Sequence, residues 1–274
     1  MCRVIDLQQA VLARNEDAAR ELREALAARG TVTVNLLSSP GSGKTALLEA
    51  ELVLAGQRGI AAAALTADLA TENDALRLAR SGAPVKQVLT DGLCHLEAAM
   101  LARHLDGWLP ESTRLLFVEN VGNLVCPASY DLGEDLRVAL ASVTEGEDKP
   151  LKYPTAFGLA NLVVVTKADL ADAVDFDESS FLANIERVNP GVEVVFTSAR
   201  TGQGVGLLLD RACAVLAGGA VHHPVMGVPS TGHHHGPPGH DHAHGNEHDH
   251  GNGHDHGPPH RHPHRDPALP PAVS

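Results

Sequence analysis

One segment constrains the fold of this chain more than any other: residues 36–48 read L-L-S-S-P-G-S-G-K-T-A-L-L. An apolar, β-branched run, Thr31–Leu37, precedes it, and a helix-forming run, Ala46–Ala55, follows it. A glycine-rich turn between a strand and a helix, closed by Lys-Thr, is typical of the phosphate-binding loop. That pattern begins with Gly, where this chain has Ser38. The segment predicts a P-loop protein that binds a nucleoside triphosphate.

The loop predicts a role for each of its residues. Its backbone N–H groups would wrap the phosphates, and the helix N-terminus would add partial positive charge. Lys44 would reach the β- and γ-phosphates and serve catalysis, and the Thr45 hydroxyl would bind Mg²⁺. The predicted nucleotide-binding residues of the loop are Pro40, Gly41, Ser42, Gly43, Lys44, Thr45 and Ala46.

Two later segments predict which base is bound. In T-K-A-D (166–169), Asp169 would accept hydrogen bonds from guanine N1–H and the 2-amino group, and Lys167 would cover the ring. Thr166 stands where Asn is commoner. Adenine offers neither donor and would leave a buried carboxylate unpaired, so GTP is favoured over ATP. The second segment follows the strand Val192–Thr197 and contributes Ser198, Ala199 and Arg200, where GTPases present a backbone N–H to guanine O6.

Acidic residues after two other apolar runs predict Mg²⁺ and switch chemistry. The run L-L-F-V-E-N-V-G (115–122) places Glu119 where GTPases usually have Asp, with Gly122 expected to sense the γ-phosphate. Asp68, which follows another strand, would bind the metal or order the attacking water; helix capping is the alternative for Asp68 and for Asp74. Asn123 stands where fast GTPases have Gln, which predicts slow turnover.

Strand and helix patterns alternate along the chain, which predicts an α/β fold with a doubly wound, mostly parallel sheet. The chain divides into an amphipathic helix (1–30), a P-loop GTPase domain (31–219) and a tail (220–274). The first helix, 7–29, has a predicted buried face of Leu7, Val11, Ala18, Leu22 and Leu26. The predicted strands are Thr31–Leu37, Ile60–Thr66, Val85–Leu89, Leu115–Glu119, Val138–Val143, Asn161–Thr166 and Val192–Thr197.

The amino-acid composition limits the classes of binding partner and the compartment that we expect. A formal net charge of −13 argues against nucleic acid and anionic membranes. No segment is apolar enough to span a bilayer, and the N-terminus lacks a signal-peptide pattern. The four scattered cysteines favour a reducing compartment, so we expect a cytoplasmic protein.

Two of those cysteines stand beside the predicted switch. Cys94 and His95 are adjacent at the expected start of a helix, and Cys126 follows Gly122 by four residues. Neighbouring side chains on a helix diverge by about 100°. A symmetric dimer, with two copies of each ligand, would therefore be needed to complete a Zn²⁺ or Ni²⁺ site. Burial as ordinary apolar side chains is the alternative, and Cys2 and Cys213 are interpreted as non-ligands.

The C-terminal segment is rich in histidine. Fifteen of the 17 histidines fall between residues 222 and 264, among Gly, Pro, Asp and Asn. Such a segment is expected to be disordered and to store Ni²⁺ or Zn²⁺; a passive tail or an affinity tag are the alternatives. The predicted tail ligands are His233, His234, His235, His240, His242, His244, His248, His250, His254, His256, His260, His262 and His264.

Several of these motifs together resemble the hydrogenase nickel-insertion GTPase family, HypB. They are T-D-G-L-C-H-L-E, E-N-V-G-N-L-V-C-P and T-E-G-E-D-K-P-L-K-Y-P, with the P-loop and A-D-L-A-T-E-N-D, within about residues 5–217. The resemblance implies a GTP-dependent homodimer with a metal on Cys94, His95 and Cys126. Many members begin with C-x-x-G-C, but this chain has only Cys2 there.

The resemblance further implies delivery of Ni²⁺ to the large subunit of [NiFe]-hydrogenase, together with other maturation proteins. The expected function is therefore that of a GTP-hydrolysing nickel metallochaperone, with GTP, Mg²⁺, Ni²⁺ and Zn²⁺ as its ligands. A urease-type nickel GTPase, a metal-storage protein without catalysis and an ATP-dependent kinase are the alternatives.

Overall fold

The computed structural model describes residues 2–68, 73–90 and 92–227, with only the backbone for residues 2–9. The predicted metal-binding histidines of the tail, from His233 to His264, lie outside these ranges. So do Thr71 and Glu72, the first two residues of the T-E-N-D segment.

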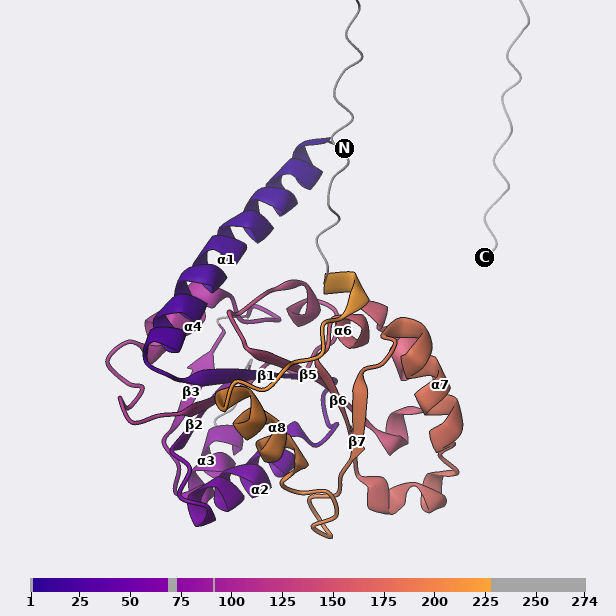
Figure 1. The fold of residues 1–274 in the computed structure, drawn as a ribbon. Coiled ribbons are helices and arrows are strands. Elements are labelled where there is room, and N and C mark those ends of the chain that lie inside the picture. The colour runs from indigo at the N-terminus through magenta and orange to yellow at the C-terminus, as the bar shows by residue number, and fades with distance from the viewer. Residues whose placement is uncertain (1, 69–72, 91, 228–274) are drawn as a thin grey trace, which may run out of the picture. The chain divides into compact units, whose positions relative to one another are not determined.

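A seven-stranded sheet forms the centre of the fold, and all of its pairings are parallel. The strand order is β3-β2-β4-β1-β5-β6-β7 (Figure 1). From β1 the chain passes to β2 and β3 at one edge, returns to β4 beside β1, and then continues through β5 and β6 to β7 at the other edge. The prediction of a doubly wound P-loop fold is confirmed. The strands are β1 (Val32–Ser38), β2 (Ala62–Asp68), β3 (Val85–Leu89), β4 (Leu115–Glu119), β5 (Leu136–Ser142), β6 (Leu162–Thr166) and β7 (Glu193–Phe196).

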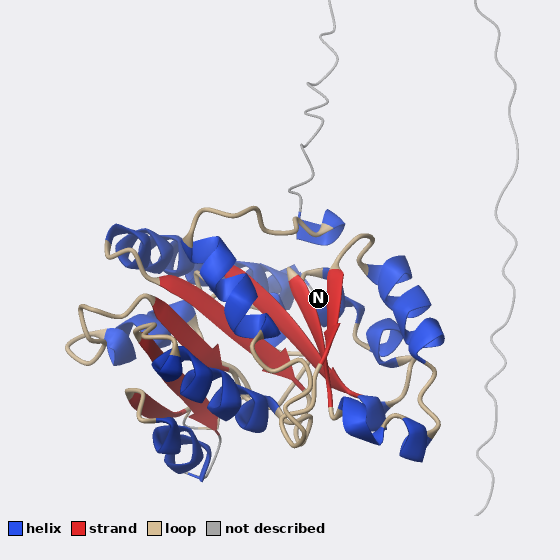
Figure 2. Cartoon of the chain, turned by 60° about the horizontal axis from the view of Figure 1, so that its bottom comes forward, coloured by secondary structure: helices blue, strands red, loops and turns tan. Residues whose placement is uncertain are grey.

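Helices cover both faces of the sheet (Figure 2). The apolar side chains of α2, α3 and α8 pack on one face, and those of α1, α4, α6 and α7 pack on the other. The helices are α1 (Cys2–Ala28), α2 (Lys44–Gln57), α3 (Asn73–Leu78), α4 (Ala98–Leu105), α5 (Lys149–Lys152), α6 (Pro154–Gly158), α7 (Glu178–Val188) and α8 (Leu207–Leu216).

Alternation along each strand divides the core between the two layers. In β4, Leu115 and Phe117 pack toward α2 and α8, whereas Leu116 and Val118 pack toward α1 and α4. Both sets are buried, which explains the continuous apolar runs that a parallel sheet needs.

The buried face of α1 differs from the predicted one. Leu22 and Leu26 are buried as predicted, whereas Val11 is 45% exposed, so placing it on the buried face was wrong; Ala18 is only half-buried, and the Leu7 side chain is not described. Asn15 and Ala19 complete the observed face, so that Asn15, Ala19, Leu22 and Leu26 follow one another at spacings of four, three and four residues. This set fits the helical repeat as well as the predicted one does, but it includes a polar residue.

Residues 220–227 return along the domain. Asn161 Nδ2 donates to the His222 carbonyl at 2.8 Å, and the His222 ring nitrogen Nε2 lies 2.8 Å from Asn189 Oδ1. The histidine-rich sequence therefore begins, at His222, within a segment that contacts the folded domain.

Within the described ranges, no helix combines the length and the apolar character that crossing a membrane requires.

Candidate nucleotide pocket and metal site

The P-loop lines a cavity of about 520 Å³. The loop between β1 and α2 forms one side of it, and residues at the C-terminal ends of β2 and β4 form another. Ligands in doubly wound folds bind at this end of the strands. The predicted residues that the structure brings together here are Pro40, Gly41, Ser42, Gly43, Lys44, Thr45, Ala46, Asp68, Asp74, Glu119 and Gly122.

Two glycines give the loop its shape. Gly41 and Gly43 have φ angles of 72° and 97°, in the left-handed region that favours glycine, and α2 begins directly after Gly43. The first free N–H groups of α2 consequently lie beside the loop, as the anion-binding role requires.

Ser38 accounts for the departure from the P-loop pattern. It is the last residue of β1 and is fully buried, and its hydroxyl donates to the Ser39 carbonyl at 2.8 Å. The same oxygen accepts hydrogen bonds from Lys44 Nζ at 2.7 Å and from the Ser42 hydroxyl. A glycine could not hold the lysine head in this way, so Ser38 positions Lys44 before any phosphate binds.

Glu119 and Thr45 are adjacent within the cavity. The Thr45 hydroxyl donates to Glu119 Oε1 at 2.6 Å, while Glu119 Oε2 is buried without a hydrogen-bond partner. Burial raises the pKa of Glu119 to about 7, although the Thr45 bond and the Lys44 charge oppose the rise. A buried carboxylate oxygen with no partner, beside a hydroxyl, fits the oxygen ligands that Mg²⁺ prefers.

The segment after β4 rests directly on the P-loop. A Cβ atom at Gly122 would lie 3.1 Å from Pro40 Cα, closer than ordinary van der Waals contact. Movement of Gly122 and rearrangement of the P-loop are therefore linked by contact.

A second cavity, of about 260 Å³, adjoins the first and shares Gly43 and Ala46 with it. Its lining brings together all of the residues predicted to bind the base, namely Thr166, Lys167, Asp169, Ser198, Ala199 and Arg200.

Asp169 is held ionised in this second cavity. Its carboxylate accepts hydrogen bonds from the Ser198 hydroxyl and from Arg200 Nε, the latter at 2.8 Å. The Ser198 bond, then the Arg200 bond, lowers the pKa of Asp169. The site therefore presents a fixed anionic acceptor, as guanine recognition needs.

The residues before Asp169 hold the P-loop. The Thr166 hydroxyl donates to the Ser42 carbonyl, and Lys167 Nζ donates to the Gly41 carbonyl at 2.8 Å. Lys167 itself has a left-handed backbone, with φ of 56°. The second cavity and the P-loop cavity are consequently tied together through the loop.

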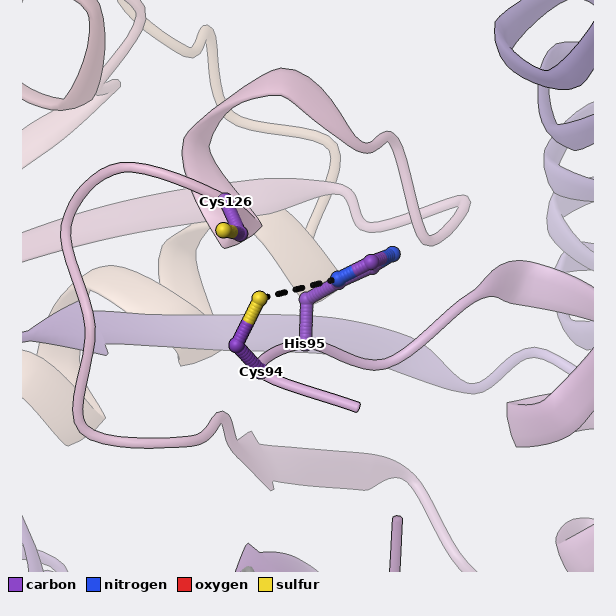
Figure 3. Close-up of side chains that lie close together, drawn as sticks. All are labelled: Cys94, His95 and Cys126. Carbon is purple, nitrogen blue, oxygen red and sulfur yellow. Dashed lines mark hydrogen bonds between the residues drawn. The ribbon is translucent and has the colours of Figure 1, made fainter. Parts of the chain in front are cut away.

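Cys94, His95 and Cys126 form a separate cluster (Figure 3). One ligand atom from each residue lies within 4.8 Å of the others, and Cys94 Sγ is 3.7 Å from His95 Nδ1. The expectation that Cys94 and His95 start a helix was wrong: both lie in the loop 92–97, and α4 begins at Ala98. The divergence of neighbouring helical side chains does not apply in this loop. A single protomer therefore gathers two thiols and an imidazole.

Burial and neighbouring groups set the protonation of the cluster. Burial lowers the pKa of His95 against the opposing charge of Glu97, which favours the neutral imidazole that metals bind. His95 Nε2 is buried without a hydrogen-bond partner, and Glu97 Oε1 lies 3.8 Å from it. The hydrogen bond with Cys126, then burial, raises the pKa of Cys94.

Tyr130 and exposed apolar residues surround the cluster. The Tyr130 ring packs on the His95 ring, with centroids 3.9 Å apart and planes inclined by 31°. Val125 and Leu93, each next to a cluster cysteine, are 64% and 40% exposed. Cys213, by contrast, packs against the core through α8 and lies outside the cluster, and the Cys2 side chain is not described.

The sheet and the P-loop cavity together define a P-loop nucleotide-binding protein. Residues 32–196 match the family model described as "CobW/HypB/UreG, nucleotide-binding domain". A hydrogenase maturation factor HypB from Azotobacter vinelandii is 46% identical over 204 residues, which cover 74% of this chain and 67% of that relative. The chain belongs to the HypB family.

Solved structures agree with this assignment. A crystal structure of HypB from Archaeoglobus fulgidus superposes with a TM-score of 0.69 at 37% identity, covering 75% of this chain and 100% of that one. A crystal structure of HypB from Helicobacter pylori, described as a complex with nickel, superposes with a TM-score of 0.68 at 35% identity. It covers 74% of this chain and 97% of that one.

Sequence reasoning missed the residues that support the cluster. Asn15 was overlooked because polar residues are normally assigned to the exposed face of a helix, although its spacing from Ala19 and Leu22 fits the buried one. Glu134 and Arg137 form a buried ion pair at 2.6 Å, and Arg137 donates to the Tyr130 carbonyl at 3.2 Å. The pair of opposite charges just before and at the start of the apolar strand β5 was the available signal.

Proposed function

We propose that this protein is a GTP-hydrolysing nickel metallochaperone that takes part in [NiFe]-hydrogenase maturation. The observation that carries the proposal is the position of the thiol–imidazole cluster. Cys126 lies four residues after Gly122, on the segment that leaves β4 and rests on the P-loop. Four residues span at most about 14 Å. A nucleotide-dependent movement of Gly122 would therefore reach a cluster ligand.

The cavities support binding and hydrolysis of GTP. Asp169 would accept the guanine N1–H and 2-amino hydrogen bonds, and Lys44, released from Ser38, would bind the β- and γ-phosphates. Thr45, Glu119 and Asp68 would hold Mg²⁺, which would neutralise charge developing on the phosphates. Asp68, at the end of β2, would also orient the attacking water. Asn123 at the position after Gly122 supports a slow turnover.

The cluster supports transient metal binding. Two thiolates and one imidazole suit Ni²⁺ and Zn²⁺, and three ligands leave a coordination position open for exchange. A second protomer across the Leu93 and Val125 surface would supply further ligands, which is the reason to propose a GTP-dependent homodimer. The nickel complex of the Helicobacter pylori relative favours Ni²⁺ as the delivered ion.

The remaining parts of the proposal rest on sequence and family. The histidine-rich tail would store Ni²⁺ in the cytoplasm, and other maturation proteins and the hydrogenase large subunit would receive the ion. A urease-type accessory role is the second candidate, since a relative from Helicobacter pylori, 37% identical over 201 residues, is named as a hydrogenase/urease maturation factor.

Complementation tests the proposal. The chain is expected to restore [NiFe]-hydrogenase activity to a strain that lacks its own HypB, and Cys126→Ala is expected to abolish that rescue. Cys213→Ala is the matched control, because Cys213 packs on the core through α8. Rescue by Cys126→Ala at limiting nickel would contradict the role of the cluster, and urease activity rescued instead of hydrogenase activity would favour the second candidate.

A further inference from the structure

We propose that Asn15 of α1 is a positioning residue for the cluster of Cys94, His95 and Cys126, because its side chain joins the two loops that carry them. The inference rests on the proposed metal-binding function of the cluster and names the residue that fixes its geometry. The N-terminal helix then supports the metal site through a residue that is not itself a ligand.

Both ends of the Asn15 side-chain amide form hydrogen bonds with these loops. Its Nδ2 donates to the Asp131 carbonyl at 2.7 Å, and its Oδ1 accepts from the Ala98 backbone N–H at 2.9 Å. The residue is 7% exposed, so water competes little for either bond. Both partners are backbone groups, which means that Asn15 positions the chain itself at these points.

Each backbone partner lies close to the cluster along the chain. Ala98 is three residues after His95 and opens α4, so its N–H is one that the helix cannot satisfy internally. Asp131 is five residues after Cys126 and directly follows Tyr130, whose ring packs on His95. The Asn15 side chain therefore ties the loop of Cys94 and His95 to the loop of Cys126.

Other contacts hold α1 in the place from which Asn15 can reach both loops. Arg23 binds both carboxylate oxygens of Asp131, at 2.7 and 2.9 Å. Gly133 approaches the α1 backbone so closely that a Cβ there would lie 2.5 Å from the Ala19 carbonyl oxygen. Leu22 packs in the same apolar group as Leu96 and Leu132, one from each loop.

Metal coordination is sensitive to this kind of tether. Bond lengths to a metal tolerate deviations of only about 0.2 Å, so two loops that drift relative to each other lose affinity. Outer groups that orient metal ligands typically contribute roughly 10–100-fold to affinity. An asparagine that only capped α4 would stabilise the fold and leave the cluster unchanged, so the two roles predict different results.

Cobalt titration of the reduced full chain distinguishes them. Cobalt bound by thiolate gives a charge-transfer absorption, and residues 228–274 contain no cysteine, so the tail does not contribute to the signal. Against a competing chelator, Asn15→Ala is expected to weaken the affinity of the thiolate site by roughly 10–100-fold. Asn15→Asp, which keeps the acceptor for Ala98 N–H and loses the donor to Asp131, is expected to fall between Asn15→Ala and the wild type.

Asn189→Ala is the matched control. Asn189 is a fully buried amide that binds the Phe157 and Ala160 carbonyls, each at 2.8 Å, and lies outside the two cluster loops. It is expected to lower the unfolding midpoint while keeping cobalt affinity within about threefold of the wild type. The proposal would be overturned if both Asn15 variants bound cobalt as tightly as Asn189→Ala does. If Asn15→Ala fails to fold, the same comparison is made with Asn15→Asp alone.

A metal-free measurement separates this inference from the proposed function. Phenylarsine oxide condenses with two neighbouring thiols, forming two arsenic–sulfur bonds and releasing water. The wild type is expected to capture it through Cys94 and Cys126, and Asn15→Ala is expected to capture it roughly tenfold more weakly, by the same loss of geometry. Capture without any thiolate–cobalt absorption in the wild type would contradict the metal site alone, whereas equal capture by both proteins would contradict the role of Asn15.

Discussion

The nucleotide cavities and the thiol–imidazole cluster are built by different means. Three residues that line the cavities end strands of the parallel sheet, namely Asp68, Glu119 and Thr166, and Ser38, which binds Lys44, ends a fourth strand. The sheet ladder therefore fixes their positions. None of the three cluster residues lies in a helix or a strand, and side chains from elsewhere, such as Asn15, hold their loops.

The two kinds of support respond differently when a ligand leaves or a loop moves. A site fixed by backbone ladders keeps its shape when a ligand leaves, because each strand is paired along its length. A site held by a few side-chain hydrogen bonds changes shape when one loop moves, and the Cys126 loop continues from the segment that rests on the P-loop. A change of nucleotide in the cavities would therefore alter the geometry of the cluster.

The largest expected effect separates the two regions completely. Lys44→Ala removes a charge-assisted phosphate contact and is expected to reduce phosphate release from GTP by at least roughly 100-fold. The thiolate–cobalt absorption is expected to stay unchanged, because Lys44 bonds to Ser38 and not to the cluster. Lys86→Ala, whose lysine donates to the His104 carbonyl at 2.6 Å, is the control. Loss of cobalt binding by nucleotide-free Lys44→Ala would contradict the separation of the cluster from the P-loop cavity.

A smaller change tests the base cavity. Asp169→Asn replaces two acceptor oxygens with one acceptor and one donor group. The substitution is expected to lower the affinity for GTP by roughly 10–100-fold, since hydrogen bonds to a charged group each contribute about 1.5–3 kcal/mol. Xanthosine triphosphate, whose C2 oxo group accepts a hydrogen bond, is expected to gain affinity. Asp172→Asn, on a carboxylate that does not line the cavity, serves as the control in fluorescence titrations. Unchanged GTP affinity in Asp169→Asn would exclude guanine recognition by this carboxylate.

The same contrast explains what could be predicted from the sequence. The P-loop and the strands were identified because each is contiguous and has a local physical cause. Strand β3 was predicted with its observed bounds, and the predicted bounds of β1 differ from the observed ones by a single residue at each end.

Tertiary contacts were harder to predict. Cys94 and His95 were placed on a helix because the following residues form helices well, yet α4 begins only at Ala98, which Asn15 caps from another part of the chain. The buried stripe of α1 was misplaced because an asparagine with two backbone partners behaves as a core residue. Neither partner is local in sequence, so no pattern near Asn15 indicates them.

The smallest expected effect concerns the burial of the Glu119 carboxylate, the proposed Mg²⁺ ligand. The pKa of Glu119 in the folded, ligand-free protein is about 7, above its ordinary value of 4.5. Its contribution to stability is therefore full below pH 4.5 and is lost as pH rises through about 7. Glu119→Gln is expected to raise the free energy of unfolding by about 1–3 kcal/mol at pH 8 and by much less at pH 5. Urea denaturation at both pH values, with the exposed Glu111→Gln as control, measures this. An equal effect at both pH values would contradict the buried, pH-dependent charge.

The most direct test of the account is the Ni²⁺ affinity of the cluster in two nucleotide states of the full chain. Thiolate–nickel charge-transfer absorption reports the cluster, since the tail has no cysteine. We expect the Ni²⁺ affinity to differ between the GDP state and the state with a non-hydrolysable GTP analogue. Bound Ni²⁺ is expected to change the nucleotide affinity by the same factor. Both differences are expected to vanish in Cys126→Ala. Equal affinities in the two nucleotide states of the wild type would mean that the cavities and the cluster share a chain without communicating.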